Sequence, residues 1–482
     1  MKILLINPPA FNEITTQVSR YVSGESSMQP PLGLMYIAAV LVSKGIDDVR
    51  IIDAQAEKIN YEELEARILK EQPDLVGMTA MTFTMTDVML TARTIRKVSP
   101  ETKIVLGGPH VDIYPEQTIN LSEIDFVIRK EGEYPFLHLV RHLTDGKTDL
   151  SEVRNLVWRD EEGRIRMNEL TASMNDYSQM PFPARHLVPL DKYFSIMTEN
   201  NPITTMISAK GCPYKCVFCY KHIDKVSYRS PKSIADEMEH IRGLGIREIF
   251  FVDDTFYVNS SVAMKICDEI IKRKIGMPWG ARARVNNISE EMLEKFKKAG
   301  CKRLHIGVES GNDRILQNLN KKITVEMAKK AFTLCRKHKI DTLAYFIIGN
   351  PGEGQKEIED TIKLARELKP SYAQFSRMTP FPATKLYDMA IERKIISYDY
   401  WKEYAKNPYV RIQPQFWTEH FTQEQLADLA DYATHKFYFS PGYMLRSVTR
   451  VNSYRDLRRK LKTGLSLLRS TSSYKSAKIK MT

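Results

Sequence analysis

The sequence predicts an α/β chain in which two successive parallel-sheet units are followed by a helical segment. Three observations support this fold class. Short apolar runs alternate with amphipathic stretches in two separate series, a proline-rich stretch (MPFPARHLVPL) lies between the series, and strand-like runs stop after about Met389. Apolar runs separated by helix-length segments are typical of parallel sheets. With 482 residues, 43% of them hydrophobic, the chain is long enough for two to three domains.

The first unit is expected to span residues 1–145 as a doubly wound, mostly parallel sheet. Five apolar runs predict its strands, with helical patterns such as YEELEARILKE between them: residues 2–6, 49–53, 74–78, 103–108 and 125–130. Ligands of such sheets bind at the carboxyl ends of the strands. The loops expected at that edge are residues 7–9, 79–82, 107–110 and 131–133.

Residues 146–200 are interpreted as a linker. They contain a hairpin-like run, NLVWRDEEGRIRMNEL, in which Glu162 and Gly163 supply the turn, and then the proline-rich stretch.

The second unit, residues 201–388, is predicted to be a partial (β/α)6 barrel of the TIM type, open or closed. Six runs predict its strands: residues 204–210, 247–254, 279–285, 303–310, 342–349 and 372–378. Ser230 followed by Pro231 predicts a helix start, and Gly300 predicts a helix end. Barrel enzymes build their sites at the carboxyl ends of the strands.

Residues 389–482 are predicted to be a helical substrate or tail domain. Aromatic residues become frequent there (Trp401, Tyr404, Trp417), and Thr422 with Gln425 forms a capping box. Residues 441–482 hold eleven Lys or Arg and one Asp, so +10 of the formal net charge of +12 lies in this tail. A nearly neutral body argues against an extended nucleic-acid interface, and the tail is either a solvated helix or a peripheral membrane contact.

The chain is expected to be cytoplasmic. No stretch reaches the roughly 18 apolar residues of a membrane span, and Asn7-Pro8-Pro9 interrupts the opening run before a signal-peptide core develops. Peripheral membrane contact through the basic tail is the alternative that stays open.

Three of the six cysteines, Cys212, Cys216 and Cys219, fall within eight positions directly after the first barrel strand. Thiolates are soft ligands suited to zinc or iron-sulfur clusters. A structural zinc site needs a fourth ligand, and the neighbouring candidate is His222. Three thiolates on a 4Fe-4S cluster leave one iron free for a cofactor with amino and carboxylate groups, such as S-adenosylmethionine (SAM). Buried apolar positions are expected for the remaining three: Cys267, Cys301 and Cys335.

The cysteine spacing, with Phe218 before the last cysteine, resembles the radical SAM superfamily. The resemblance implies that the three cysteines are catalytic ligands of a 4Fe-4S cluster that cleaves SAM. Asp253 and Asp254 are then expected at the SAM amino group, and Arg282 or Arg284 at its carboxylate. The other contacts that it implies are Glu309 and Ser310 at the ribose and methionine portion, and Gly349, Pro351 and Gly352 at the adenine.

The first unit resembles the cobalamin-binding, Rossmann-like domain that precedes the barrel in one radical SAM subclass. The resemblance lies in ILLINPP, PPLGLMYIAAVLVSKG, LGGPHV and KEGE. It implies a corrin at the carboxyl strand ends. The Asp-x-His-x-x-Gly signature of many cobalt-ligating proteins does not occur, and His110 is the histidine on these loops, so the axial ligand stays open. The expected corrin contacts are Asn7, Thr79, Met81, Gly108, Pro109 and Gly132.

The two resemblances together imply a cobalamin-dependent methyltransferase that acts on an unactivated carbon of a small or lipid-like substrate. They also imply an external electron donor such as a flavodoxin or ferredoxin. Aromatic residues in the helical tail favour an apolar substrate. Three alternatives stay open: radical cyclisation or oxidation of a tetrapyrrole or lipid, methylthio transfer to RNA, and a non-enzymatic cobalamin- or zinc-binding protein. The RNA class is expected to carry three further cysteines before residue 200, and the first cysteine here is Cys212.

Overall fold

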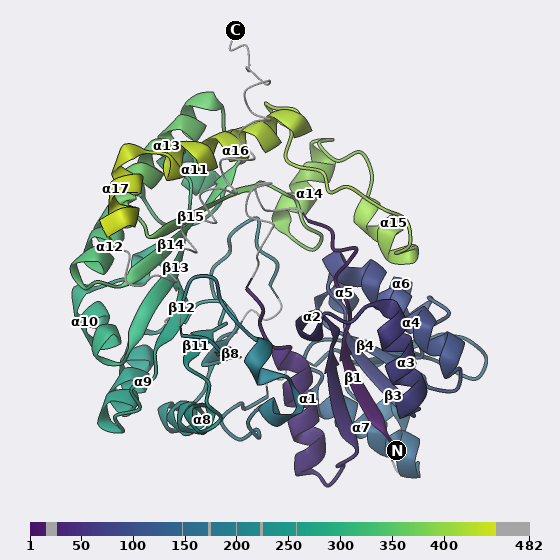
Figure 1. Ribbon diagram of the computed structural model, residues 1–482. Coiled ribbons are helices and arrows are strands. Elements are labelled where there is room, and N and C mark those ends of the chain that lie inside the picture. Colours follow the sequence, from purple (N-terminus) through teal and green to yellow (C-terminus); the bar gives the residue numbers. More distant parts are fainter. Residues whose placement is uncertain are drawn as a thin grey trace.

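The computed structural model describes residues 1–15, 27–146, 148–171, 175–198, 200–221, 225–256 and 258–449. Figure 1 shows two sheets side by side, with helices α14 (Lys385–Glu392) and α15 (Tyr400–Lys406) reaching from the second unit over the first. The expected α/β class, with two sheet units and a helical segment, is confirmed.

The first sheet has seven strands in the order β2-β1-β3-β4-β5-β6-β7, and β2 to β5 run parallel. All five strands predicted before residue 145 are present within a residue or two of their expected bounds. The strands are β1 (Ile3–Asn7), β2 (Val49–Asp53), β3 (Leu75–Thr79), β4 (Lys103–Gly107), β5 (Phe126–Ile128), β6 (Leu156–Arg159) and β7 (Ile165–Met167).

Helices cover both faces of this sheet because alternate strand residues point to opposite faces. In β1, Ile3 and Leu5 face one apolar core and Leu4 and Ile6 face the other. Helices α1 (Leu32–Ser43) and α7 (Glu133–Asp145) cover the first face, and α3 (Tyr61–Glu71) and α4 (Met85–Val98) cover the second. The short helices α2 (Ala54–Glu57), α5 (Pro109–Ile113) and α6 (Pro115–Ile119) lie in its loops.

The sheet continues past residue 145 into the segment assigned to a linker. The predicted hairpin is present, and β6 pairs antiparallel with β5. Leu156 and Val157 are buried, so the pairing covers the edge of β5 as well as adding apolar contacts. Met180, Ala184 and Tyr193 then pack into the core beneath α1. Much of residues 146–200 is thus part of the first unit, because the apolar side chains of this segment pack into that core.

The second sheet has six parallel strands in the order β15-β14-β13-β12-β11-β8, as predicted from the six apolar runs. Strands β8 and β15 lie at its two edges, so the barrel is open. The strands are β8 (Ile203–Met206), β11 (Glu248–Phe251), β12 (Trp279–Arg284), β13 (Cys301–Glu309), β14 (Asp341–Ile348) and β15 (Tyr372–Arg377). A two-stranded ribbon of β9 (Ala209–Lys210) and β10 (Ser227–Tyr228) follows β8.

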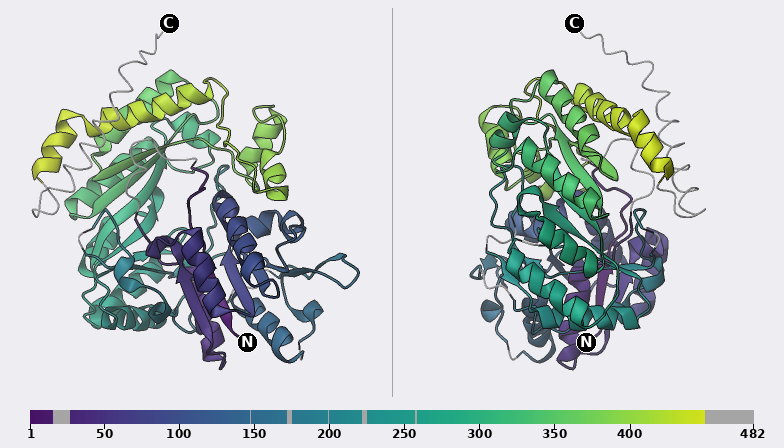
Figure 2. Two further views of the ribbon diagram at one scale, coloured as in Figure 1. Left: turned by 45° about the vertical axis from the view of Figure 1, so that its right-hand side comes forward. Right: turned by 90° about the vertical axis from the view of Figure 1, so that its left-hand side faces the viewer.

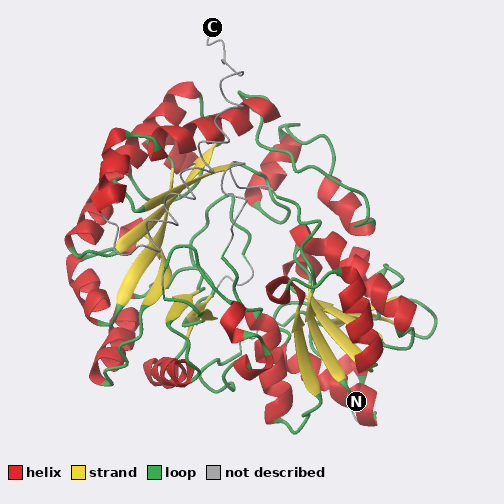
Figure 3. Ribbon diagram, viewed as in Figure 1, coloured by secondary structure: helices red, strands yellow, loops and turns green. Residues whose placement is uncertain are grey.

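The helices of this unit line the outer, convex side of the sheet, as the right-hand view in Figure 2 and the red ribbons of Figure 3 show. The Ser230 side chain caps α8, as predicted, by accepting from the Ser233 amide. The inner face of the sheet turns toward the first unit. The helices are α8 (Pro231–Gly243), α9 (Ser260–Lys272), α10 (Glu290–Lys298), α11 (Asp313–Asn318), α12 (Val325–Lys337) and α13 (Gln355–Leu368).

The helical segment joins the two units. Trp401 and Tyr404 of α15 are buried against the first unit, where the Tyr404 hydroxyl lies 2.9 Å from Thr86 Oγ1. The predicted capping box begins α16 (Gln423–Tyr438), whose Phe437 packs on the core of the second sheet. Helix α17 (Pro441–Thr449) follows, and most of the basic tail lies outside the described residues. Within the described ranges, no helix is both long and apolar enough to span a bilayer.

Candidate functional site

The cysteine loop, residues 211–220, lies at the carboxyl end of the barrel strands and is fixed at its centre. The Val217 amide donates to the Leu319 carbonyl (3.1 Å), and the Leu386 amide donates to the Val217 carbonyl (2.8 Å). Val217 is buried between these elements. The loop is therefore held between the end of α11 and the start of α14, with Cys212, Cys216 and Cys219 on either side of the anchor.

The three thiols share one electrostatic environment. Desolvation raises the pKa of Cys219 to about 11 although the thiol reaches solvent, and Cys216 and Cys212 add to the rise while the Lys321 ammonium opposes it. Arg284 Nη1 donates to the Cys216 sulfur at 3.5 Å. Lys321 and Arg284 thus place two positive charges beside the loop, which would offset the charge of thiolates once a metal has displaced the thiol protons.

The donor set of the loop fits a 4Fe-4S cluster. Thiolates on three irons of a cube stand further apart than three ligands of one ion, and the described residues contain no group of three His, Cys, Asp or Glu side chains close enough for a single ion. Soft thiolates without a carboxylate or imidazole on the loop suit iron and sulfide. His222, the candidate fourth zinc ligand, lies outside the described residues.

Lys321 is a residue of this site that the sequence did not indicate. Its Nζ lies 2.5 Å from Glu309 Oε1 and 5.8 Å from the ring centroid of Phe218. Glu309 adopts a left-handed φ of 71° at the end of β13. A Cβ at Gly307 would overlap Glu309 Oε1 and lie 2.8 Å from Lys321 Nζ, so glycine makes room for this buried ion pair. No motif surrounds Lys321 that predicts the contact.

The two neighbouring aspartates have different environments. Asp253 is buried and accepts hydrogen bonds from the Ser208 amide (2.7 Å) and the Ser208 hydroxyl, and burial raises its pKa to about 7. Asp254 is exposed, and its charge contributes to the raised pKa of Cys219. Asp254 therefore faces the cysteine site, whereas Asp253 fixes the strand end.

Of the other predicted SAM contacts in the barrel, some lie at the cysteine loop and others pack against helices. Arg284 stacks on Tyr214, with its guanidinium carbon 3.7 Å from the ring centroid, next to Cys216. Ser310 is fully buried and lies 3.3 Å from Thr361 Oγ1 of α13, so it packs against a helix. Gly349 lies under Leu426 of α16, and the carbonyl of Pro351 accepts from Asn318 (3.0 Å). The SAM-binding roles of these residues remain predictions.

Glu353 predicts a pH dependence of stability. Its Oε2 accepts from the amides of Gly349 (2.7 Å) and Asn350 (3.0 Å), and its buried Oε1 has no hydrogen-bond partner among the described residues. Burial raises the pKa of this carboxyl to about 7. Between about pH 4.5 and 7 the folded chain keeps a proton that the unfolded chain releases, so this group lowers stability as pH rises through that window. Glu353→Gln should remove up to about 3 kcal/mol of this fall.

Urea unfolding at pH 5 and at pH 8 measures this effect as the change in the free energy of unfolding between the two pH values for each variant. Glu359→Gln, on the exposed face of α13, should keep the wild-type dependence. An equal pH dependence in wild type and Glu353→Gln would show that Glu353 titrates normally.

The six expected corrin contacts all lie at the carboxyl edge of the first sheet. Asn7 donates to Asp53 (2.8 Å), and Met81 is 41% exposed. Gly108 has a φ of 100°, and a Cβ there would lie 2.9 Å from the Ala80 carbonyl oxygen, so only glycine is accommodated. Thr79, Pro109 and Gly132 occupy the adjoining strand and helix ends.

His110 is fully buried beneath this edge. Its Nδ1 lies 3.2 Å from Thr82 Oγ1, and burial lowers its pKa to about 3, so the ring is neutral. The described edge thus presents small and apolar groups, with its histidine buried, which fits a broad flat ligand lying across the strand ends.

The cysteine loop is tied at both ends to this edge. Lys210, two residues before Cys212, places Nζ 3.2 Å from Glu131 and 3.8 Å from Glu133. Beyond Cys219, the Tyr220 hydroxyl donates to Asp112 Oδ2 (3.2 Å). The barrel rim and the ligand edge of the first sheet are therefore fixed next to each other.

Lys210→Met should lower the free energy of unfolding by about 1–3 kcal/mol, because two nearly buried carboxylates lose their cation. Lys210→Arg should restore most of the loss. Lys232→Met, which removes an exposed ion pair within α8, is the control and should cost less than about 0.5 kcal/mol. Urea unfolding measures the free energy of unfolding of each variant. An equal loss in Lys210→Met and Lys232→Met would contradict the role of Lys210.

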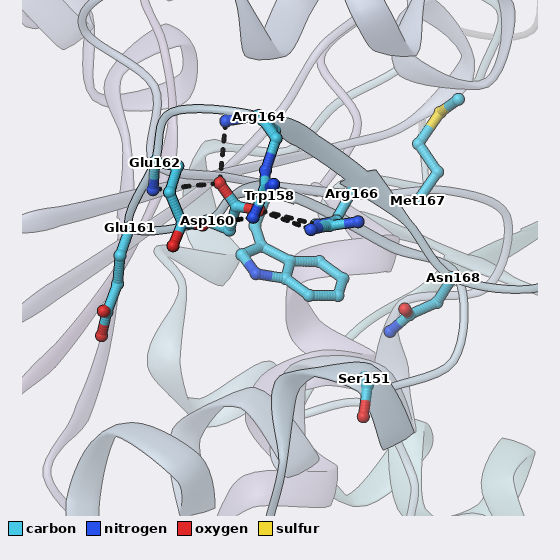
Figure 4. A pocket seen from close by; sticks show the side chains of 9 residues that line it. All are labelled: Ser151, Trp158, Asp160, Glu161, Glu162, Arg164, Arg166, Met167 and Asn168. Carbon is cyan, nitrogen blue, oxygen red and sulfur yellow. Dashed lines mark hydrogen bonds and ion pairs between the residues drawn. The ribbon is translucent and has the colours of Figure 1, made fainter.

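A shallow hollow beside the β6–β7 hairpin is separate from these sites (Figure 4). Asp160 forms ion pairs with Arg164 (2.9 Å) and Arg166 (2.8 Å) there, so these three charges offset one another. None of the cysteine-loop or strand-edge residues lines it. The lining residues are Ser151, Trp158, Asp160, Glu161, Glu162, Arg164, Arg166, Met167 and Asn168.

Two family models match the chain. Residues 206–365 match the radical SAM superfamily, and residues 26–140 match the B12 binding domain. The chain is 34% identical over 453 residues to "Uncharacterized methyltransferase PH0819" of Pyrococcus horikoshii, which covers 93% of this chain and 95% of that protein. It is 29% identical to the anaerobic magnesium-protoporphyrin IX monomethyl ester cyclase of Rubrivivax gelatinosus, over 80% of this chain and 69% of the cyclase.

Solved structures share the whole fold. The radical SAM methyltransferase TsrM from Kitasatospora setae, with cobalamin and a [4Fe-4S] cluster bound, aligns with a TM-score of 0.72 and 17% identity, covering 98% of this chain and 100% of that chain. The cobalamin-dependent SAM radical enzyme OxsB aligns with a TM-score of 0.70 and 17% identity, covering 97% of this chain and 72% of that chain. The two-unit arrangement is therefore common to these proteins.

Proposed function

The chain belongs to the radical SAM superfamily and carries a B12 binding domain in front of its barrel, and on this premise we propose that it is a cobalamin-dependent methyltransferase. Its substrate would be a small organic molecule that is methylated at an unactivated carbon. The observation that supports this most is the pair of ties, Lys210 to Glu131 and Tyr220 to Asp112, between the cysteine loop and the ligand edge of the first sheet.

When bound, the cluster with SAM supplies a carbon-centred radical, and cobalamin supplies a methyl group. The chain's own residues bind and orient these groups. Cys212, Cys216 and Cys219 would hold three irons, while Arg284 and Lys321 offset the negative charge of the thiolates.

Residues around the open iron would bind SAM. Exposed Asp254 suits the ammonium group of SAM, and Arg284 at the cysteine loop suits its carboxylate. Glu309, held by Lys321, has a second carboxylate oxygen for a ribose hydroxyl. Helices α14 and α16 pack on the two apolar cores through Leu386 and Phe437, and closing the site against water would be their part in the reaction.

Corrin binding would use the exposed edge around Met81 and Gly108. Because His110 is buried and bonded to Thr82, we propose that the described loops do not supply an imidazole to cobalt. The lower face of the corrin would then rest on backbone and apolar groups.

A second candidate is radical cyclisation or oxidation of a tetrapyrrole. The 29% identity to the Rubrivivax gelatinosus cyclase over most of the chain favours it. The two reactions differ in product mass. Methylation adds one CH2 unit and forms S-adenosylhomocysteine, whereas cyclisation or oxidation adds no methyl group.

The test is anaerobic reconstitution with iron, sulfide and hydroxocobalamin, followed by reduction and addition of SAM. We expect 5′-deoxyadenosine and, with methyl-labelled SAM, transfer of the label to the bound corrin. Reconstituted protein that forms neither product would reject the proposal. Label on the corrin without 5′-deoxyadenosine would reject the radical part of it.

We propose a flavodoxin or ferredoxin as electron donor, because the cluster needs single electrons. Peripheral membrane contact through the basic tail would involve residues mostly outside the described ranges, and it stays a prediction that liposome sedimentation tests.

A further inference from the structure

Several cationic side chains lie along the inner side of the barrel sheet, and two of them are held in ion pairs. Arg303 is paired with Glu248 (2.9 Å), and Lys321 is paired with Glu309 (2.5 Å). Arg282 also lies on this face, because its neighbours Ala281 and Ala283 face the helices. Within the described ranges, no carboxylate comes within ion-pair distance of Arg282. Its guanidinium is exposed and donates to the Val252 carbonyl (3.1 Å).

His305 and Tyr345 form a directed hydrogen-bond chain beside this arginine. Arg303 Nε donates to His305 Nε2 (3.3 Å), which requires that nitrogen to be the acceptor. Burial, with Arg303 and Arg282 nearby, lowers the pKa of His305 well below its usual value, so the ring is neutral. Its proton then lies on Nδ1, which donates to the Tyr345 hydroxyl oxygen at 3.0 Å.

The consequence is a phenol with a free donor. Because the Tyr345 oxygen accepts from His305, its own O–H has to point elsewhere. Arg282 is the register partner of His305, and its charge lowers the pKa of Tyr345 against the rise from burial. A guanidinium and a phenol that both donate therefore flank His305 on the inner face, one from β12 and one from β14.

Arg282 and His305 lie one layer deeper than the cofactor rim, whereas Tyr345 pairs in register with Gly307 at the level of Arg284 and hydrogen-bonds to His305 from there. Arg284, at the cysteine loop, pairs in register with Gly307, whereas Arg282 pairs with His305 two residues earlier on each strand. In parallel strands the earlier residues lie further from the carboxyl rim. Arg282 thus lies below Arg284, on the side of the interior away from the three cysteines.

We propose that Arg282 and Tyr345 form a subsite for an oxyanion of the substrate, a carboxylate or a phosphate. Guanidinium and phenol donors match such a group, and the neutral His305 orients the phenol. The subsite rests on the proposed function, because it holds the substrate beneath SAM. With Arg282 in this subsite, Arg284 alone would bind the SAM carboxylate. The substrate would then have a polar contact in addition to the apolar contacts that the aromatic residues of the helical tail suggest.

The test is anaerobic calorimetric titration of the reconstituted holoenzyme with sodium phosphate and, separately, with sodium acetate. Saturating S-adenosylhomocysteine is present, and sodium chloride keeps the ionic strength constant. At least one anion should bind saturably, and Arg282→Gln should weaken it about tenfold or more. Tyr345→Phe should weaken it less, and Arg282→Lys should retain part of the affinity. Arg247→Gln, an equal charge change at the opposite end of the neighbouring strand, should leave it unchanged.

The outcomes separate the sources of the anion. Binding of acetate alone indicates a carboxylate, and binding of phosphate alone indicates a phosphate group. The proposal is overturned if neither anion binds saturably, if Arg282→Gln binds as wild type does, or if S-adenosylhomocysteine abolishes the binding. Formation of 5′-deoxyadenosine by the wild-type chain tests the proposed function separately, so the subsite can fail while that function stands.

Discussion

Cys216→Ala is expected to abolish SAM cleavage. The substitution removes one of the three thiolates and the acceptor of the Arg284 hydrogen bond, and a cluster with two protein ligands is not retained. We expect iron and sulfide to fall well below four per chain after anaerobic reconstitution. Formation of 5′-deoxyadenosine should be undetectable, measured by liquid chromatography.

Cys267→Ala is the matched control. Cys267 is fully buried in α9 among apolar side chains, so its removal changes packing and leaves the cysteine loop intact. Full cluster content in Cys216→Ala, or equal loss in the two variants, would contradict the assignment of Cys216.

Glu237→Gln is expected to have the largest effect on stability. Glu237 is fully buried, with Oε1 2.7 Å from Arg185 and Oε2 2.5 Å from Arg229, and both arginines are buried too. Burial alone would raise the pKa of Glu237, yet the two guanidinium groups hold it below its usual value. Loss of the carboxylate leaves two buried cations without a counterion, which should cost about 3–5 kcal/mol.

Chemical unfolding at pH 7 measures this loss. Glu239→Gln is the control on the same helix, because Glu239 is 39% exposed and lies 3.4 Å from Arg273, so its loss should stay below about 1 kcal/mol. A loss of less than about 1 kcal/mol in Glu237→Gln would show that the triad is not a stabilising contact between residues 175–198 and the barrel.

The strands of both sheets could be predicted from the sequence because parallel strands buried on both faces have near-continuous apolar runs. Helix ends such as Ser230 and Thr422 could also be predicted, since capping depends on neighbours within four residues. The pairing of β6 with β5 could not, because a hairpin pattern does not say which strand it joins.

The candidate site shows the same division. The cysteines form a local motif with a fixed spacing, so they stand out in the sequence. Lys321 contacts Glu309, 12 residues away in the sequence, and Lys210 contacts Glu131, 79 residues away. No local sequence pattern predicts such contacts. Ser310 illustrates the converse, since it follows a strand end as a rim residue would but packs against α13.

Electron paramagnetic resonance of the reduced, reconstituted chain, with and without SAM, tests the central claim most directly. If three cysteines hold a 4Fe-4S cluster with one iron open to SAM, the reduced protein gives a cluster signal whose shape changes when SAM is added. A signal that SAM leaves unchanged, or reconstituted protein with one zinc and no iron signal, would contradict it.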